Sequence, residues 1–210
     1  VHCVETHSRY RQLYGIGPRR WQLRQTGAMG AGLCGPAIVV DWQSDRWRVC
    51  NLAMDFAPIN LADLDALTEL WSVGYVQGHK GRVPDELMKL RTPDSFRERL
   101  AAFSGRSLVA KSDGTILGFC LMKDNEIYQF YVAQAAQGTG AASALMQRSL
   151  QALADAGHDH AFLAVDKANA RAIGFYEKAG FYNDGAQVID VATSQGPFAY
   201  ECFIFKTKLN

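Results

Sequence analysis

The sequence lacks both an excess of one charge and a long apolar run. Its 210 residues carry 22 Lys and Arg against 21 Asp and Glu, a formal net charge of +1. Proteins that bind nucleic acid or anionic membranes through their overall charge carry a marked basic excess, so neither partner is expected. The nearest candidate for a membrane span, residues 25–40, is Gly-rich and shorter than the roughly 18–20 residues that such a helix needs.

Paired cysteines are also missing. The five Cys are an odd number and none lies in a C-x-x-C pair, so neither a disulfide framework nor a zinc ribbon is predicted. This usage favours a reduced, cytoplasmic protein. Arg19 and Arg20 faintly resemble a twin-arginine export signal, but Gln22 stands where an apolar residue is expected. The His-Asp-His run at 158–160 has no third and fourth ligand beside it, so no metal site is predicted.

The charge balance hides two unlike parts. Residues 1–53 hold 7 Arg, no Lys and 3 acidic residues, and the acidic excess lies in residues 54–210. The first part shows no sustained hydrophobic period, whereas regular patterns begin at Met54. We therefore expect residues 1–53 to be an extension that is poorly ordered or dispensable, as an over-extended gene start would produce, and residues 54–210 to form one domain.

Hydrophobic periodicity and turn residues predict a mixed α and β domain. A helix is expected after Asp63 and should fade near Gly74–Gly78, and a polar loop is expected over residues 77–84. One further helix is expected with Pro84 at its first position and another with Pro93 at its first position. Two more are expected over residues 141–156 and 169–179. Strands are expected at residues 54–60, 107–111, 115–122, 126–132, 161–165, 186–193 and 198–207. Their order implies an antiparallel meander followed by one parallel pair.

The segment Gln-Gly-Thr-Gly-Ala-Ala at 137–142 lies between a predicted strand and a long helix. Its glycines let the backbone approach a ligand, and the free N–H groups of the helix start favour a phosphate or diphosphate. A Walker loop is excluded because no Lys follows the spacer. A dinucleotide fingerprint would require Gly at Ser143 and a parallel sheet before it. A glycine loop without function is the remaining alternative.

With its surroundings, this segment resembles the GNAT superfamily of acetyl-CoA-dependent N-acetyltransferases. The resemblance rests on the pattern [QR]-x-x-G-x-[GA] at 137–142, on EIYQFYV at 126–132 and on NARAIGFYEKAGF at 169–181. It covers about residues 54–210. It implies an α/β (α+β) fold in which a mixed, mostly antiparallel sheet of six or seven strands has helices on both faces. Strands four and five of that fold splay apart into a cleft.

The resemblance also implies where acetyl-CoA, the co-substrate, would bind. The backbone of the glycine-containing segment would hold the diphosphate, and Gln137 stands where Arg is commoner in the family, which removes one positive charge. The residues implied in cofactor binding are Tyr131, Val132, Gln137, Gly138, Thr139, Gly140, Ala141, Ala142 and Asn169.

Four residues, one of them the Val132 already named, are implied in the chemistry. Tyr176 matches the family tyrosine that donates a proton to the departing thiolate, and its alternative role is packing beside Phe175. The N–H of Val132 is expected to polarise the carbonyl. Glu126 is the candidate general base, and His79, expected in the acceptor loop, is a second one. Either residue could equally be an ordinary solvated side chain.

The acceptor is expected to be a primary amine of a small molecule. Lys80 and Arg82 would favour a carboxylate on it, whereas the acidic excess of the domain tolerates cationic amines. A protein N-terminus or a lysine is the alternative substrate, and a homodimer is left open. Rival functions are a CoA-binding sensor without catalysis and a nucleic-acid binder built on the Arg-rich residues 1–53.

Overall fold

The computed structural model describes residues 54–209. The expected extension, residues 1–53, lies outside them. Within the described range no helix combines the length and the apolar character that crossing a membrane requires.

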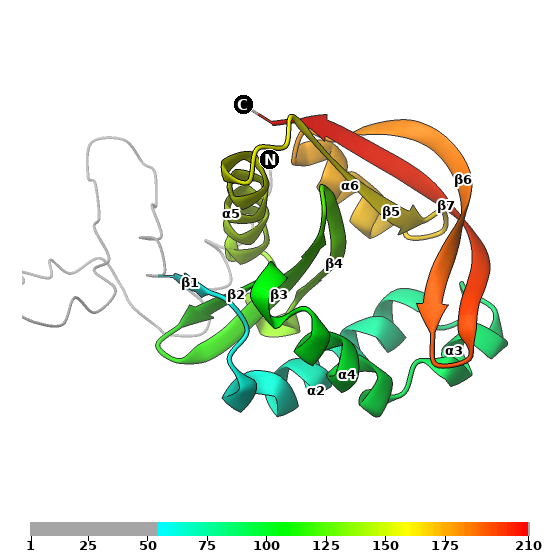
Figure 1. Cartoon of the computed structure of the whole chain (residues 1–210), viewed down its shortest axis with the longest axis horizontal. Helices are drawn as coiled ribbons and strands as arrows, with labels where there is room; N and C mark the ends of the chain where they lie inside the picture. Colours follow the sequence, from blue (N-terminus) through cyan, green and yellow to red (C-terminus); the bar gives the residue numbers. More distant parts are fainter. Residues whose placement is uncertain (1–53, 210) are drawn as a thin grey trace, which may run out of the picture. The chain divides into compact units, whose positions relative to one another are not determined.

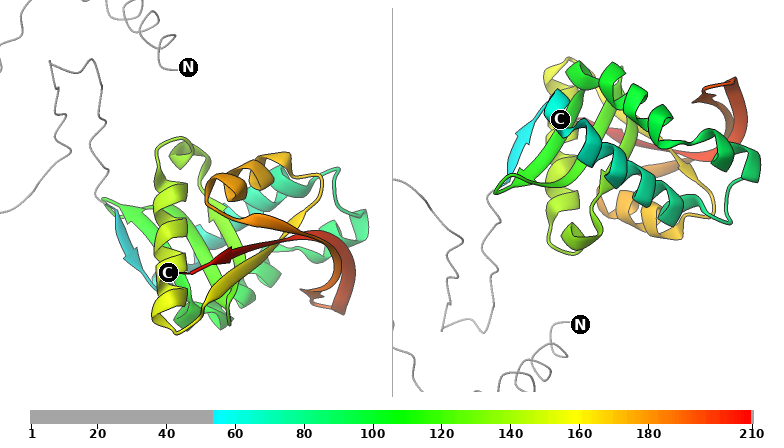
Figure 2. Two further views of the ribbon diagram at one scale, coloured as in Figure 1. Left: turned by 90° about the horizontal axis from the view of Figure 1, so that it is seen from above. Right: turned by 90° about the horizontal axis from the view of Figure 1, so that it is seen from below.

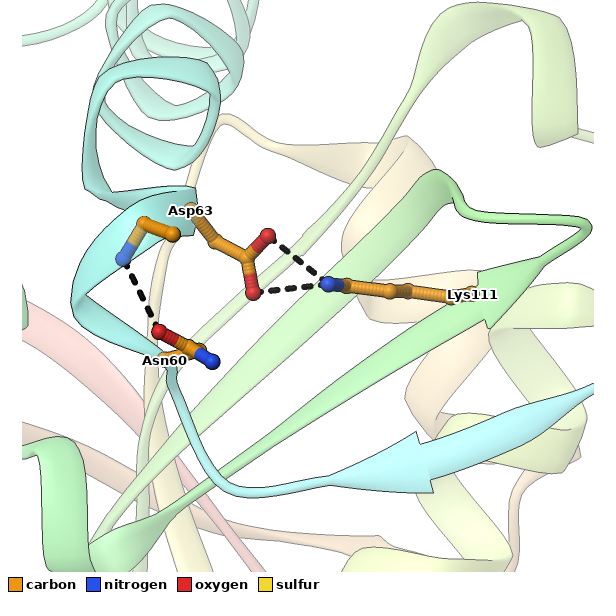
Figure 3. A network of polar contacts seen from close by, with 4 residues as sticks. Asn60, Asp63 and Lys111 are labelled. Atoms are coloured by element: carbon orange, nitrogen blue, oxygen red, sulfur yellow. Dashed lines mark hydrogen bonds and ion pairs between the residues drawn. The ribbon is translucent and has the colours of Figure 1, made fainter.

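The first apolar stripe forms α2, Leu64–His79, which follows a 3-10 turn, η1, Leu61–Asp63. Asn60 caps this turn by accepting a hydrogen bond from the Ala62 N–H at 2.9 Å. Both carboxylate oxygens of Asp63 lie 2.7 Å from Lys111 Nζ on β2, Ser107–Ser112 (Figure 3). The start of α2 is therefore tied to the sheet through a half-buried ion pair.

Two predictions about this region are wrong. The loop does not begin at residue 77, because the helix continues through Gly74 and Gly78 to His79; His79 therefore belongs to the last turn of α2 rather than to a loop. Pro84 is the N-cap of α3, Asp85–Leu90, and not its first residue. The next helix, α4, Pro93–Ala102, begins as predicted: Thr92 Oγ1 accepts from the Ser95 N–H, and Pro93 occupies the first turn.

Seven strands form one sheet in the order β1-β2-β3-β4-β5-β7-β6 (Figure 1). All neighbours are antiparallel except β4 and β5, which are parallel as expected. The β2–β3 turn holds Asp113 and Gly114 at φ 48° and 76°, the left-handed geometry of a tight hairpin. The other strands are β1, Asp55–Ala57; β3, Thr115–Lys123; β4, Glu126–Val132; β5, His160–Asp166; β6, Tyr182–Thr193; and β7, Gly196–Lys208.

Helices cover both faces of the sheet (Figure 2). Leu67, Trp71 and Phe96 of α2 and α4 pack with Phe119 of β3 on one face. On the other face, α5, Ala141–Asp155, and α6, Ala170–Lys178, pack over a second apolar cluster. Members of that second cluster include Cys120, Leu145, Met146, Leu163 and Phe205. The fold class expected from the sequence is therefore confirmed.

Candidate active site

Strands β4 and β5 hold together only at their start. Their single register pair is Glu126 opposite Phe162, next to which the Phe162 N–H donates to the Asn125 carbonyl at 3.1 Å. Beyond that point the two strands diverge (Figure 1). The edge of β4 that faces β5 is thus left without a strand partner along most of its length, and its backbone groups can pair with an extended ligand.

The direction of the Val132 N–H follows from its neighbour. The Ala133 N–H donates to the Leu117 carbonyl on the β3 side at 2.8 Å. Successive N–H groups of a strand point to opposite edges, so the Val132 N–H points toward the gap. A β-bulge lies further back in β4, because Leu121 pairs with Gln129 while Met122 pairs with Ile127, which leaves one residue of β4 unpaired.

The side chain of Tyr131 packs on the face of β4 that α2 covers. Its ring lies 5.9 Å from that of Trp71 and 5.6 Å from that of Phe119, measured between centroids. A Cβ atom on Gly74 would lie 2.6 Å from Tyr131 Cδ1. The absence of a side chain at Gly74 therefore lets α2 approach β4 closely.

The glycine-containing segment leads from β4 into α5. Gly138 and Gly140 have φ of 80° and 92°, and a Cβ atom on either would meet no heavy atom within 4 Å. Gly140 is the N-cap of α5 and supplies no side-chain hydrogen bond. Thr139 instead turns back, its hydroxyl donating to the Ala136 carbonyl at 2.7 Å.

These contacts leave the start of α5 suited to an anion. The first intrahelical bond runs from Ala144 to Gly140, so the N–H groups of Ala142 and Ser143 belong to the first turn, which has no acceptor within the helix. The helix dipole adds positive potential there. Open space over Gly138 and Gly140 leaves room for a bulky group, so this geometry fits a diphosphate as the sequence predicts.

Asn169 is the N-cap of α6. Its Oδ1 accepts from the Ala172 N–H at 3.2 Å, so this oxygen is occupied by the helix. Its Nδ2 lies 3.9 Å from where a Cβ atom on Gly78 of α2 would be. Only the N–H groups of the amide remain for a ligand, which narrows the role that the resemblance implies for this residue.

Tyr176 lies on α6 among aromatic rings. Its centroid is 5.5 Å from Phe175, 6.0 Å from Phe181 and 6.5 Å from Phe205. Burial, together with the field of Cys120, raises the pKa of its hydroxyl. The hydroxyl is therefore protonated at neutral pH, as a proton donor must be.

The structure does not bring Glu126 and Val132 together. They are the first and last residues of β4, and six residue steps of a strand span about 20 Å. Burial raises the pKa of the Glu126 carboxyl, but this side chain lies beside the β3–β4 turn, where Glu126 pairs with Lys123. A base at Glu126 and a carbonyl polarised by Val132 would not act directly on one reacting carbon.

His79 has the geometry of a base. Its ring stacks on Tyr75 with centroids 4.3 Å apart, and its Nδ1 lies 3.0 Å from the Tyr75 carbonyl oxygen. A carbonyl only accepts, so Nδ1 carries the proton and Nε2 of the neutral ring keeps its lone pair. Burial lowers the pKa of His79, which favours this neutral form.

Six polar residues that interact electrostatically with His79 or with one another were not predicted from the sequence. Together with His79 we call them the acceptor-side cluster; it unites side chains from helices, β-strands and the α3–α4 junction. Arg99 donates to the Tyr128 hydroxyl at 2.5 Å and lies over the Trp71 ring at 4.7 Å. Nothing in their local sequence patterns marks them, since they meet only in the folded chain. The members are Tyr75, His79, Arg91, Arg99, Tyr128, Asp166 and Tyr200.

A hollow of about 270 Å³ lies between α2 and the end of β4. Gln77 Nε2 and Gln134 Oε1 are 3.4 Å apart, and both residues line it. Val132 also lines the hollow, so it adjoins the exposed end of β4 rather than the acceptor-side cluster. In the described residues no group of three or more His, Cys, Asp or Glu side chains has the arrangement of a metal site.

A model of the acetyltransferase (GNAT) family matches residues 64–181, which is more than half of the chain. Uncharacterised N-acetyltransferases of Mycobacterium bovis and Mycobacterium tuberculosis are 38% identical to the chain over 97 residues. That match takes in 44% of this chain and 62% of the length of those relatives.

Solved structures share the fold at low sequence identity. A GCN5-related N-acetyltransferase from Rhodopseudomonas palustris superposes with a TM-score of 0.60 at 16% identity, covering 74% of this chain and 95% of that one. The PaiA N-acetyltransferase from Thermoplasma acidophilum, in complex with coenzyme A, gives 0.56 at 18% identity, with 74% and 99% covered. YncA from Salmonella typhimurium, with its cofactor acetyl-CoA, gives 0.56 at 20% identity, with 75% and 94% covered.

Proposed function

Because the chain belongs to the GNAT family of acetyltransferases, we propose that it transfers an acetyl group from acetyl-CoA to a primary amine of a small molecule. The observation that carries this proposal is the unpartnered edge of β4, which leads into the glycine-flanked start of α5, where the N–H groups of Ala142 and Ser143 have no acceptor within the helix. An extended chain ending in a diphosphate needs these two features, arranged in this order.

Bound acetyl-CoA supplies an activated thioester. The N–H groups of Ala142 and Ser143 would hold its diphosphate, and the backbone of β4 would pair with the arm that follows. The N–H of Val132 would donate to the thioester carbonyl oxygen and polarise it. The carbonyl would then be open to attack by a neutral amine.

Two side chains would move the protons. His79 would accept a proton from the attacking amine through Nε2, because Nδ1 already donates to the Tyr75 carbonyl. Tyr176 would donate its proton toward the departing thiolate, since burial keeps its hydroxyl protonated. A small acceptor is favoured because no member of the acceptor-side cluster is fully exposed: Tyr75 and Asp166 are buried and the others are partly buried.

The test is thiol release from acetyl-CoA over a panel of small amines, with a peptide N-terminus and a lysine peptide as competitors. Turnover of small amines supports the proposal, and turnover of the peptides alone contradicts the substrate class. A protein that binds acetyl-CoA but releases no thiol with any amine would be a sensor rather than an enzyme.

Two variants separate binding from chemistry. Tyr176→Phe should lower kcat by a factor of about 10²–10⁴, the usual range for a lost general acid, with acetyl-CoA affinity unchanged; exposed Tyr182→Phe is the control. Gly140→Val should weaken CoA binding in calorimetry. Gly157→Val, at the other end of α5 with φ 90° and equally open space, matches its backbone strain but should bind CoA normally. Equal losses in the two glycine variants would mean that strain, not the site, is responsible.

A further inference from the structure

Arg91 has an unusual position, between α3 and α4. It follows Leu90, the last residue of α3, and precedes the N-cap Thr92. Its Nε and Nη1 are both buried, and neither has a hydrogen-bond partner in the part of the chain that the structure describes. Burial lowers the pKa of Arg91, but an arginine keeps its charge in proteins. A buried, incompletely paired guanidinium is costly unless an anion completes its contacts.

No protein carboxylate fills that role. The ion pairs within residues 54–209 use other groups, and neither Arg91 nor Arg99 takes part in one. Arg99 is occupied by the Tyr128 hydroxyl and by the Trp71 ring. Arg91 lies beside the Tyr75 hydroxyl, and its Nε and Nη1 are the guanidinium donors of this cluster that have no acceptor within residues 54–209.

Asp166 is the carboxylate of the cluster, and it is already committed. Only 6% of its surface is exposed. Its Oδ1 accepts from the Ala168 N–H at 2.7 Å, and its Oδ2 accepts from the Tyr200 hydroxyl at 3.1 Å. Burial lowers the pKa of His79 and raises that of Tyr75; the negative charge of Asp166 opposes the first shift and adds to the second. A fixed negative group that acts on His79 favours a cationic amine nearby.

The cluster lies next to the reacting end of β4. Tyr75, whose hydroxyl lies beside the Arg91 guanidinium, is one helical turn beyond Trp71, and Trp71 packs on Tyr131. The far end of the β6–β7 hairpin, which carries Tyr200, lies at the same end of the molecule as α3 (Figures 1 and 2). Arg91 is thus linked to the Val132 end of β4 by a series of packed rings: Tyr75, Phe96, Trp71 and Tyr131.

The charges of the cluster indicate what kind of anion it takes. Arg91 and Arg99 are positive, Asp166 is negative, and His79 and the tyrosines are neutral, which leaves one net positive charge. A single carboxylate balances it when the amine of the same ligand is neutral, which is the form that attacks the thioester. A phosphate would bring up to two negative charges into a site that already holds Asp166.

We propose that the acceptor is an amino-carboxylate, a small primary amine whose own carboxylate binds the unpartnered Arg91 guanidinium while its amine lies between His79 and Asp166. This inference rests on the proposed function for its chemistry, but the binding half of it can be tested separately. Lys80 and Arg82, the cations suggested by the sequence, are exposed, and Arg82 donates to the Gly78 carbonyl at 2.8 Å instead.

The experiment compares amino acids with their carboxamides, which keep the amine and lose the charge. Wild type should acetylate the acids with a kcat/KM at least 10-fold above that of the amides. Arg91→Met should remove this preference by raising KM for the acids, with kcat/KM for the amides little changed, and Arg91→Lys should restore part of it. Arg97→Met, which removes an arginine from the exposed surface of α4, should leave the preference intact.

A second readout does not depend on turnover. In the presence of CoA, an acid should raise the melting temperature of wild type while its amide does not, and Arg91→Met should abolish this shift. Unliganded Arg91→Met should melt no lower than wild type, because it removes a buried charge that lacks a partner.

The outcomes separate the two proposals. Efficient acetylation of amides and acids alike supports the proposed function and overturns the role of Arg91. A carboxylate-specific shift in melting temperature without any thiol release supports the Arg91 site and overturns the proposed function. Equal loss of acid and amide turnover in Arg91→Met also overturns the Arg91 site. If Arg91→Met does not fold, the absence of a preference for acids over amides in wild type overturns it.

Discussion

The contact between α2 and β4 can be tested by adding one carbon atom. Gly74 and Gly78 are one turn apart in α2, and replacing either by Ala removes the backbone entropy penalty of glycine, worth up to about 1 kcal/mol. The two sites differ in their neighbours. A Cβ atom on Gly78 would come no closer than 3.9 Å to Asn169, whereas one on Gly74 would lie 2.6 Å from the Tyr131 ring.

The magnitude follows from that difference. Carbon atoms normally pack about 3.5–4.0 Å apart, so the overlap at Gly74 is close to 1 Å. Trp71 and Phe119 flank the Tyr131 ring and restrict how far it can move away from Gly74. Forcing an extra carbon into a packed core costs about 1–3 kcal/mol. Since the helix term is similar in both variants, the difference between them should equal this cost.

Urea unfolding and thermal melting measure it. Gly78→Ala should be neutral or slightly stabilising, and Gly74→Ala should be destabilised relative to it by about 1–3 kcal/mol. For a domain of this size, each kcal/mol corresponds to about 2–4 °C in melting temperature. Adding Tyr131→Leu to Gly74→Ala should recover part of the loss, which a double-mutant cycle quantifies. If Gly74→Ala stabilises the protein as much as Gly78→Ala does, α2 and β4 are not packed as described.

Three further predictions concern His79, the two buried cysteines and the ion pair at the start of α2. Burial lowers the pKa of His79, so the base stays neutral to lower pH; the acid limb of kcat/KM should lie below about 6.5 and disappear in His79→Gln. The contribution of neutral His79 to the stability of the folded protein is present above about pH 6.5, the ordinary pKa of histidine, and is lost as pH falls through the lowered pKa of the folded state. Burial raises the pKa of Cys120 to about 12 and that of Cys202 to about 11. Peptide mapping should therefore find both unalkylated by iodoacetamide at pH 8 until the protein unfolds, and rapid native labelling would contradict their burial. A double-mutant cycle on Asp63 and Lys111 should give about 0.5–1 kcal/mol, decreasing with salt; a coupling of zero would mean that the pair does not tie α2 to the sheet.

Local patterns predicted the elements of the fold well. Thr92 and Pro93 predict the start of α4, and Asp113 with Gly114 predicts the β2–β3 turn, because capping and left-handed turn geometry depend on few neighbouring residues. The parallel β4–β5 pair follows equally from the strand–helix–strand order.

The sequence misleads where a residue serves a distant contact. Gly74 and Gly78 suggest a weakening helix, yet Gly74 is also small because Tyr131 lies against it, 57 positions later in the chain. Beginning the loop at residue 77 placed His79 outside the helix and hid its stacking on Tyr75.

The acceptor-side cluster could not be predicted for the same reason. Arg91, Asp166 and Tyr200 are far apart along the chain, and none belongs to a recognisable motif. For Glu126 the sequence suggested a role instead of hiding one. Its residue type and its strand suit a general base, but the length of β4 separates it from Val132.

The gap in the sheet also bears on cooperativity. Backbone pairing joins β1–β4 to β5–β7 at one register position only, so the two halves depend on side-chain contacts such as the stack of Phe130 on Phe175, with centroids 5.6 Å apart. Without a ligand they can open as separate units, and amide exchange should be faster at the inner edges of β4 and β5 than in β3. A ligand that lies in the gap would contact both halves and hold them together. Saturating it should slow exchange on both sides at once and raise the unfolding free energy in proportion to the logarithm of its concentration.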